Sequence, residues 1–124
     1  AKQAMNQANN NGQFNDWSKD GIVTHNGFSL ENDSGYRYWQ LPNGWKLVEI
    51  IISSKLSTSD FRGGEWFTLP DTIKANGYQI REPLVGGYYT NQSSPTTISL
   101  NPTASDAVQH GEWIHSLHTM YFSK

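Results

Sequence analysis

The sequence predicts an all-β domain built as an antiparallel, jelly-roll-like β-sandwich. Turn-forming pairs recur at short spacing after residue 12, and the segments between them are rich in Ile, Val, Thr, Tyr, Phe and Trp, which is typical of sandwiches and barrels. With 124 residues, the chain has the length of one domain. The turn signals are Asn26-Gly27, Asp33-Ser34-Gly35, Asn43-Gly44, Gly63-Gly64, Asn76-Gly77, Gly86-Gly87, Ser94-Pro95 and Asn101-Pro102.

A short helix is expected before the sandwich, over residues 1–11. The segment has no β-branched residue, and the Asn-rich stretch that runs into Gly12 favours a helix end. A helix of this length is marginal in water by itself, so we expect it to end a longer helix or to join a bundle between chains, with a frayed tail as the alternative. The predicted division is a helical neck at 1–12 and a β-sandwich at 13–124. The residues at helical spacing are Ala1, Ala4, Met5 and Ala8.

Two hairpins are predicted from Asn-Gly pairs, which tolerate the positive φ of tight turns. The first joins strands at 36–41 and 45–53 through Asn43-Gly44. The second joins strands at 22–25 and 28–30 through Asn26-Gly27.

The segment 47–52 is apolar on both alternating faces apart from Glu49, which predicts a central strand covered on both sides. One face would meet the domain core and the other a partner chain. Later strands are expected at 88–90, 96–100 and 113–122, and a long loop at 69–83. The tryptophans expected in the core or on strand faces are Trp17, Trp39, Trp45 and Trp113.

Composition excludes several classes of function. The formal net charge is −2, which leaves no basic surplus for a nucleic-acid backbone. No run of 18 apolar residues is present, so we expect no membrane insertion. The absence of cysteine excludes disulfides and thiolate metal sites. Asn, Ser, Thr and Gly supply 44 of the 124 residues, which predicts a polar, weakly charged surface.

Metal binding and covalent catalysis are poorly supported by the motifs. His110, His115 and His118 are close in sequence, but residues three apart on a strand point to opposite faces, so we expect no metal and no cofactor. A glycosidase needs two carboxylates, one with a raised pKa, and it remains the enzymatic alternative. Its candidate carboxylates are Asp60, Glu65, Asp71 and Glu112.

The loop around Gly63-Gly64 carries the residue types that bind sugars. Carboxylates and a guanidinium form charge-assisted hydrogen bonds to hydroxyls, and an indole offers a flat apolar platform. Tyr and Asn add contact area and hydrogen bonds at low entropic cost. The predicted carbohydrate-binding residues are Asp60, Arg62, Glu65 and Trp66, followed in rank by Tyr89, Asn91 and His110. The alternative to a sugar-binding loop is that Trp66 belongs to the core and that Asp60 and Arg62 form an ordinary surface pair.

The segment 36–50, with the order Tyr36-Arg37-Tyr38-Trp39, Asn43-Gly44-Trp45 and Glu49, resembles an aromatic hairpin of bacteriophage tail-fibre and baseplate proteins. The segments Trp66-Phe67-Thr68-Leu69-Pro70 and Ile80-Arg81-Glu82-Pro83 resemble a loop of the same proteins. Together they resemble the head domain of receptor-binding proteins from phages of Gram-positive bacteria, over residues 36–122. The insertion at 74–77 departs from the family loop.

The resemblance implies a homotrimer in the virion, at the extracellular tail tip, whose head binds host cell-wall saccharide without covalent chemistry. It also implies that other baseplate or tail proteins attach on the N-terminal side. Three alternatives remain open: a polysaccharide-degrading glycosidase, a structural fibre cap, and a stand-alone carbohydrate-binding module.

Overall fold

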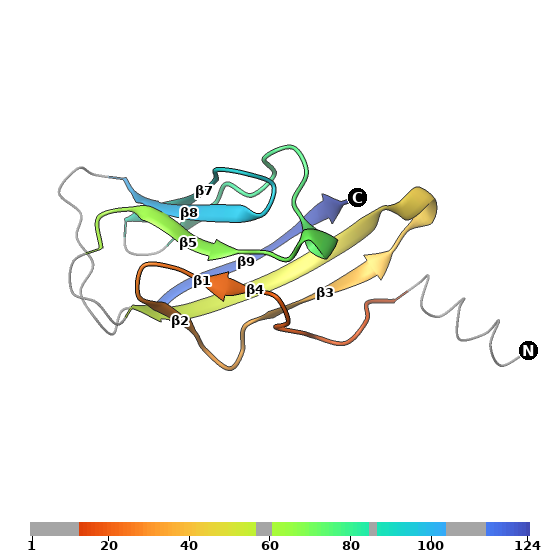
Figure 1. Ribbon diagram of the computed structural model, residues 1–124, viewed down its shortest axis with the longest axis horizontal. Helices are drawn as coiled ribbons and strands as arrows, with labels where there is room; N and C mark the ends of the chain where they lie inside the picture. Colours follow the sequence, from red (N-terminus) through yellow and green to blue (C-terminus); the bar gives the residue numbers. More distant parts are fainter. Residues whose placement is uncertain (1–12, 57–60, 85–86, 104–113) are drawn as a thin grey trace, which may run out of the picture.

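The computed structural model describes residues 13–56, 61–84, 87–103 and 114–124. These residues form nine strands and two short 3₁₀ turns, and all strand pairs are antiparallel. Figure 1 shows the strands arranged as two layers with the core between them. The predicted all-β, sandwich-like architecture is confirmed. The expected helix at 1–11 lies outside the described residues.

The four-stranded sheet is organised around β4 (Lys46–Leu56), the longest strand described. β3 (Gly35–Gln40) and β2 (Phe28–Leu30) pair with one edge of β4, and β9 (Ile114–Ser123) pairs with the other. The predicted hairpin through Asn43-Gly44 is confirmed as β3–β4, with η1 (Pro42–Gly44) at its tip. Asn43 and Gly44 have φ angles of 63° and 82°, the positive values that this turn requires.

The five-stranded sheet has the strand order β1-β5-β8-β7-β6. Its central strand, β8, pairs with β5 on one side and β7 on the other. Its strands are β1 (Val23–Thr24), β5 (Gly64–Thr68), β6 (Pro83–Leu84), β7 (Tyr88–Gln92) and β8 (Thr97–Pro102).

The second predicted hairpin is wrong as a pair of bonded strands. Asn26 and Gly27 do form a turn, with φ angles of 55° and 84°, and the Phe28 N–H donates to the His25 carbonyl at 3.1 Å. β1 then pairs with β5, whereas β2 pairs with β4. The turn therefore carries the chain from one sheet to the other instead of closing a hairpin.

The core lies between the sheets and contains both aliphatic and aromatic side chains. The alternate residues Val48, Ile50 and Ile52 of β4 are fully buried and face the five-stranded sheet. This confirms the predicted inner face of the central strand. The largest fully buried side chains are Trp66, Tyr88, Phe67, Ile50, Ile52, Leu56, Leu69, Ile73, Ile80, Ile98 and Leu100.

A β-bulge in β5 turns two consecutive aromatic residues into this core. Glu65 pairs with Ser99 and Phe67 pairs with Ile98, so Trp66 is the extra residue between them. Trp66 and Phe67 are both fully buried, with ring centroids 5.1 Å apart. The Trp66 Nε1–H donates to Ser54 Oγ of β4 at 2.8 Å, which links the two sheets through the core.

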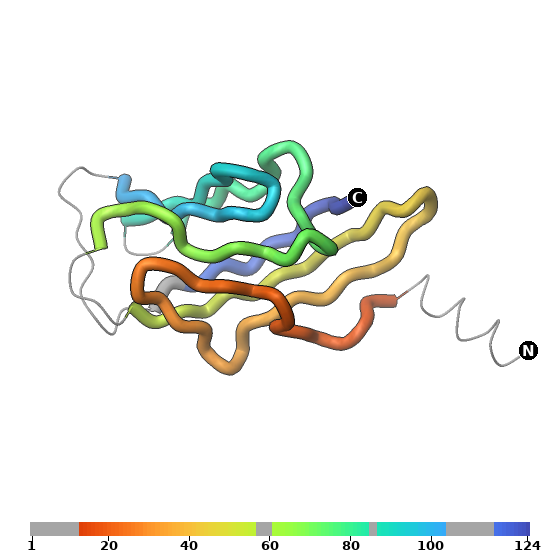
Figure 2. The backbone as a smooth tube through the Cα atoms, in the orientation of Figure 1, coloured from red at the N-terminus to blue at the C-terminus, as the bar shows by residue number. Residues whose placement is uncertain are grey.

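The predicted loop at 69–83 has little regular structure but contributes to the core. It contains one 3₁₀ turn, η2 (Asp71–Ile73), before β6 begins at Pro83. Ile73 and Ala75 are fully buried, and the side-chain amide of Gln92 donates to the Ala75 carbonyl. Figure 2 shows this segment at the end of the sandwich that holds the C terminus, where Gln79 Oε1 accepts from the Phe122 N–H.

Because Trp66 connects the sheets, its substitution should cost stability. We expect Trp66→Phe to lower the free energy of unfolding by about 1–3 kcal/mol, since the bond to Ser54 is lost, and Trp66→Ala by about 3–5 kcal/mol. Urea unfolding followed by circular dichroism measures both. Trp45→Phe is the matched control, because Trp45 is exposed and its substitution should change stability by less than about 0.5 kcal/mol. Equal losses for Trp66→Phe and Trp45→Phe would contradict the assignment.

Candidate functional site

The outer surface of the five-stranded sheet is a polar face assembled from three strands. Glu65 of β5, Ser99 of β8 and Asn91 of β7 are consecutive partners across the sheet. Directly opposed side chains on one face lie within reach of a common ligand. Tyr89 pairs with Asn101 in the adjacent row. We call Glu65, Tyr89, Asn91, Ser99 and Asn101 the polar sheet face.

A shallow hollow of about 380 Å³ adjoins this face at Tyr89. The Arg81 guanidinium lies 6.0 Å from the centroid of the Tyr89 ring, so a positive charge and an aromatic ring are neighbours at this hollow. Glu82 Oε1 accepts a hydrogen bond from Thr119 Oγ1 at 3.2 Å, so this carboxylate is held in place. The hollow is lined by Arg81, Glu82, Pro83, Tyr89 and Thr103.

The structure brings together three of the predicted sugar-binding residues. Glu65 and Asn91 are exposed and Tyr89 is half-buried, all on the polar sheet face. Arg62 is exposed just before β5. Asp60 and His110 lie outside the described residues, as does Glu112 of the glycosidase alternative.

The burial of Trp66 contradicts the prediction that its indole contacts a sugar. Its side chain is 0% exposed, so the indole face is not accessible to a ligand in this structure. Trp66 follows the outward-facing Glu65 in β5 and is the extra residue of the bulge, so its side chain enters the core together with that of Phe67. Variants at Trp66 therefore report on stability, and a test of sugar binding must use other residues.

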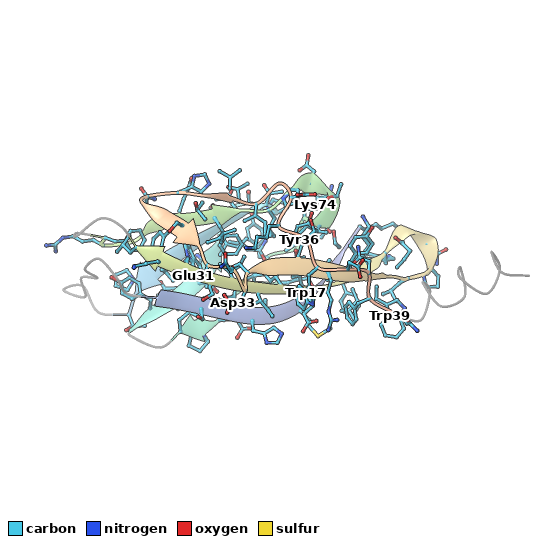
Figure 3. The ribbon with its side chains drawn as sticks, turned by 90° about the horizontal axis from the view of Figure 1, so that it is seen from below. Trp17, Glu31, Asp33, Tyr36, Trp39 and Lys74 are labelled. Carbon is cyan, nitrogen blue, oxygen red and sulfur yellow. The ribbon has the colours of Figure 1, made fainter. Side chains whose placement is uncertain are left out.

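The outer surface of the four-stranded sheet carries an apolar patch at the end nearest the β3–β4 hairpin. Trp39, Leu47 and Phe122 are consecutive partners across β3, β4 and β9, and Met120 lies beside them on β9. Figure 3 shows Trp17 and Trp39 on the side of β3 opposite Tyr36, which is a core residue. We call Trp17, Trp39, Leu47, Met120 and Phe122 the apolar sheet face.

A charged cluster lies beside this patch, in the row of the sheet that Met120 shares with Glu49 and Arg37. Arg37 Nε donates to Glu49 Oε1 at 2.7 Å, and His118 Nε2 lies 2.7 Å from Glu49 Oε2. The guanidinium lies near two rings, 4.5 Å from the Phe14 centroid and 4.7 Å from the Trp17 centroid. The hydrogen bond from His118, together with the bond and charge of Arg37, holds the pKa of Glu49 below its ordinary value of 4.5 against the opposing effect of desolvation.

A second hollow, of about 590 Å³, lies beyond the apolar sheet face at the tip of the β3–β4 hairpin. Trp45 is exposed along it, and the Lys124 ammonium lies 5.3 Å from the Trp45 ring. This hollow was not predicted from the sequence, although a Trp directly after the Asn43-Gly44 turn indicates an aromatic side chain at the hairpin tip. Its lining residues are Leu41, Pro42, Trp45, Asn76, Gln79 and Phe122.

Among the described residues, no group of three or more His, Asp and Glu side chains could hold a metal ion. The segment of His115 and His118 is a strand, as predicted, and His118 binds Glu49. Within the same residues, no helix has the length and apolar character needed to cross a bilayer.

Comparison of the chain with protein-family models, with curated proteins and with solved structures found no significant match.

The Glu49 cluster predicts a pH-dependent contribution to stability. A carboxylate whose pKa is lower in the folded state than in the unfolded state stabilises the protein above the unfolded value and loses that effect as pH falls through the folded value. We therefore expect Glu49→Gln to lower the free energy of unfolding by about 1 kcal/mol at pH 7, and the difference to shrink steadily below pH 4.5.

Chemical unfolding of wild type and Glu49→Gln at several pH values measures this difference. Glu31→Gln is the control, because the Glu31 carboxylate takes part in no ion pair among the described residues. A difference between wild type and Glu49→Gln that stays constant from pH 7 to pH 3 would contradict the role given to the charge.

Proposed function

We propose that the domain is an adhesion module that binds a saccharide non-covalently on the polar sheet face. One observation supports this most directly: Glu65, Asn91 and Tyr89, predicted separately from the sequence, converge on one exposed face through the register of β5, β8 and β7. A sugar presents hydroxyls and an apolar C–H surface, and this face offers groups for both.

The roles of the side chains follow from their chemistry. Glu65 accepts hydrogen bonds from hydroxyls, while the amides of Asn91 and Asn101 both donate and accept. The Tyr89 ring supplies the apolar surface, and Arg81 beside it donates to hydroxyl or acidic groups. Glu65 is exposed, unlike the desolvated acid that glycoside hydrolysis needs, so this carboxylate is better suited to binding hydroxyls than to donating a proton in cleavage.

In the proposed setting, this domain is the head of a phage receptor-binding protein in the virion. Its ligand is a cell-wall saccharide of a Gram-positive host, and the chain is a homotrimer that other baseplate or tail proteins hold on its N-terminal side. The jelly-roll variant of the sandwich and the helical neck belong to the same proposal. These points rest on the resemblance of segments such as 36–50 to bacteriophage tail-fibre and baseplate proteins. The polar sheet face is compatible with them.

Substitution of Tyr89 tests the proposed face. We expect Tyr89→Ala to weaken binding of purified Gram-positive cell-wall polysaccharide about tenfold, because roughly 1.4 kcal/mol of ring contact is lost. Isothermal titration calorimetry with soluble fragments measures the affinity. Tyr78→Ala is the matched control, since Tyr78 is 66% exposed and lies on the loop before β6, and its affinity should equal that of the wild type.

Two further variants extend the test, namely Asn91→Ala and Glu65→Gln, each with an expected loss of several-fold. Wild-type affinity in all three variants would exclude the polar sheet face as the binding site. Release of reducing ends from cell wall by the wild type would favour the glycosidase alternative instead. Absence of glycan binding by the wild type would favour a structural cap.

A further inference from the structure

We propose that the hollow at the tip of the β3–β4 hairpin binds a small ring compound that carries a carboxylate. The hollow shares no residue with the polar sheet face, so this second site does not depend on saccharide binding. Its volume of about 590 Å³ lies within the range of small-molecule sites in proteins, roughly 300–1,000 Å³.

Three segments distant in sequence form the walls of this hollow and are bonded to one another. The Gln79 side chain donates to the Phe122 carbonyl at 2.7 Å and accepts from the Phe122 N–H at 2.9 Å. Asn76 Oδ1 accepts from the Lys124 N–H at 2.9 Å. These bonds attach the loop before β6 to the end of β9, so little ordering of the walls is required when a ligand binds.

Most of the wall surface is apolar. Trp45 is 37% exposed and Phe122 is 49% exposed, and Leu41 and Pro42 complete the apolar lining. Aromatic side chains contact a cyclic ligand over a large area at low entropic cost, because each has only two side-chain torsions. A ring bound here would remove apolar surface from water on both the ligand and the protein.

The polar atoms available at the hollow are hydrogen-bond donors. The Lys124 ammonium lies 5.3 Å from the Trp45 ring, and neither it nor the Trp45 Nε1–H has an acceptor among the described residues. The side-chain oxygens of Asn76 and Gln79 already accept backbone N–H groups, and none of the six lining residues is acidic. The ligand must therefore supply the acceptors, and a carboxylate supplies two oxygens with a charge opposite to that of Lys124.

This choice of polar groups separates the ligand of the hollow from other classes of small molecule. Sugar hydroxyls donate as well as accept, so a saccharide needs acceptors such as Glu65 of the polar sheet face. A cationic ligand would be repelled by Lys124. An uncharged apolar ligand would leave the ammonium without a counter-charge. A ring that carries a carboxylate satisfies both the apolar walls and the donors.

Titration of naphthylacetate into the full chain tests the site, with naphthylacetamide as the uncharged analogue. Heteronuclear NMR follows the Trp45 indole N–H and the Asn76 side-chain amide. We expect both signals to shift saturably with naphthylacetate, with a dissociation constant of about 1 mM or lower. The amide should bind about fivefold more weakly, because it lacks the charge that pairs with Lys124.

Two variants locate the site. Lys124→Gln should weaken the binding of naphthylacetate about fivefold and leave the affinity for naphthylacetamide unchanged. Lys55→Gln is the matched control, because it removes the same charge from an exposed lysine at the other end of β4 and should bind like the wild type. Trp45→Ala should weaken the binding of both compounds at least tenfold, measured on the Asn76 amide, because the ring contact is lost.

The proposal is overturned if naphthylacetate shifts neither signal, if naphthylacetamide binds equally well, or if Lys124→Gln and Lys55→Gln have equal affinity. Signals of Trp45 and Asn76 that shift with protein concentration alone would assign the hollow to a second copy of the chain, which also overturns it. Titration of cell-wall saccharide into Lys124→Gln tests the proposed function separately, because the polar sheet face is unchanged in this variant.

Discussion

The burial of Trp66 is the constraint on which both the core and the candidate site depend. A strand that alternated strictly would bury only one of the neighbours Trp66 and Phe67, but the bulge in β5 buries both. The Trp66 indole N–H then has to find a partner inside the protein, and Ser54 of the opposite sheet supplies it. The same bulge sets the direction of Glu65, which faces outward opposite Ser99. Packing between the sheets thus determines which side chains the outer surface can offer to a ligand.

The two outer faces differ in the kind of partner they can bind. The polar sheet face presents hydroxyl, amide and carboxylate groups such as Ser99, Asn91 and Glu65, which are well hydrated and exchange water for ligand hydroxyls at low cost. The apolar sheet face presents Met120 and Phe122, whose contact with water is unfavourable until another apolar surface covers them. A weak, reversible ligand suits the first face, and a protein surface suits the second. The two faces have no residue in common.

Local sequence predicted those parts of the fold that local chemistry controls. The Asn43-Gly44 turn and the alternation of 47–52 were sufficient for the β3–β4 hairpin and for the inner face of β4. The change of sheet at Asn26-Gly27 was not visible, because a turn of the same conformation can join paired or diverging strands, and the partners of β1 and β2 are distant in sequence. The proximity of Glu65 and Asn91 depends on β8 lying between them, which is non-local pairing. Residue types therefore indicated which chemical groups the candidate site could contain. Which of these residues lie together on one face could be known only from the strand register.

Glu49 shows how a charged residue can lie between two apolar neighbours, Leu47 and Ile51, on the outer face of a strand. Its position between Leu47 and Ile51 would be costly if the carboxylate were covered without partners. Arg37, directly opposite on β3, and His118, two residues along β9 from its opposite neighbour Met120, each bind one carboxylate oxygen. The guanidinium is covered in turn by Phe14 and Trp17 from the segment before β1. A carboxylate satisfied in this way stays charged on the outer face of the sheet, and removal of either donor would leave one of its oxygens without its partner.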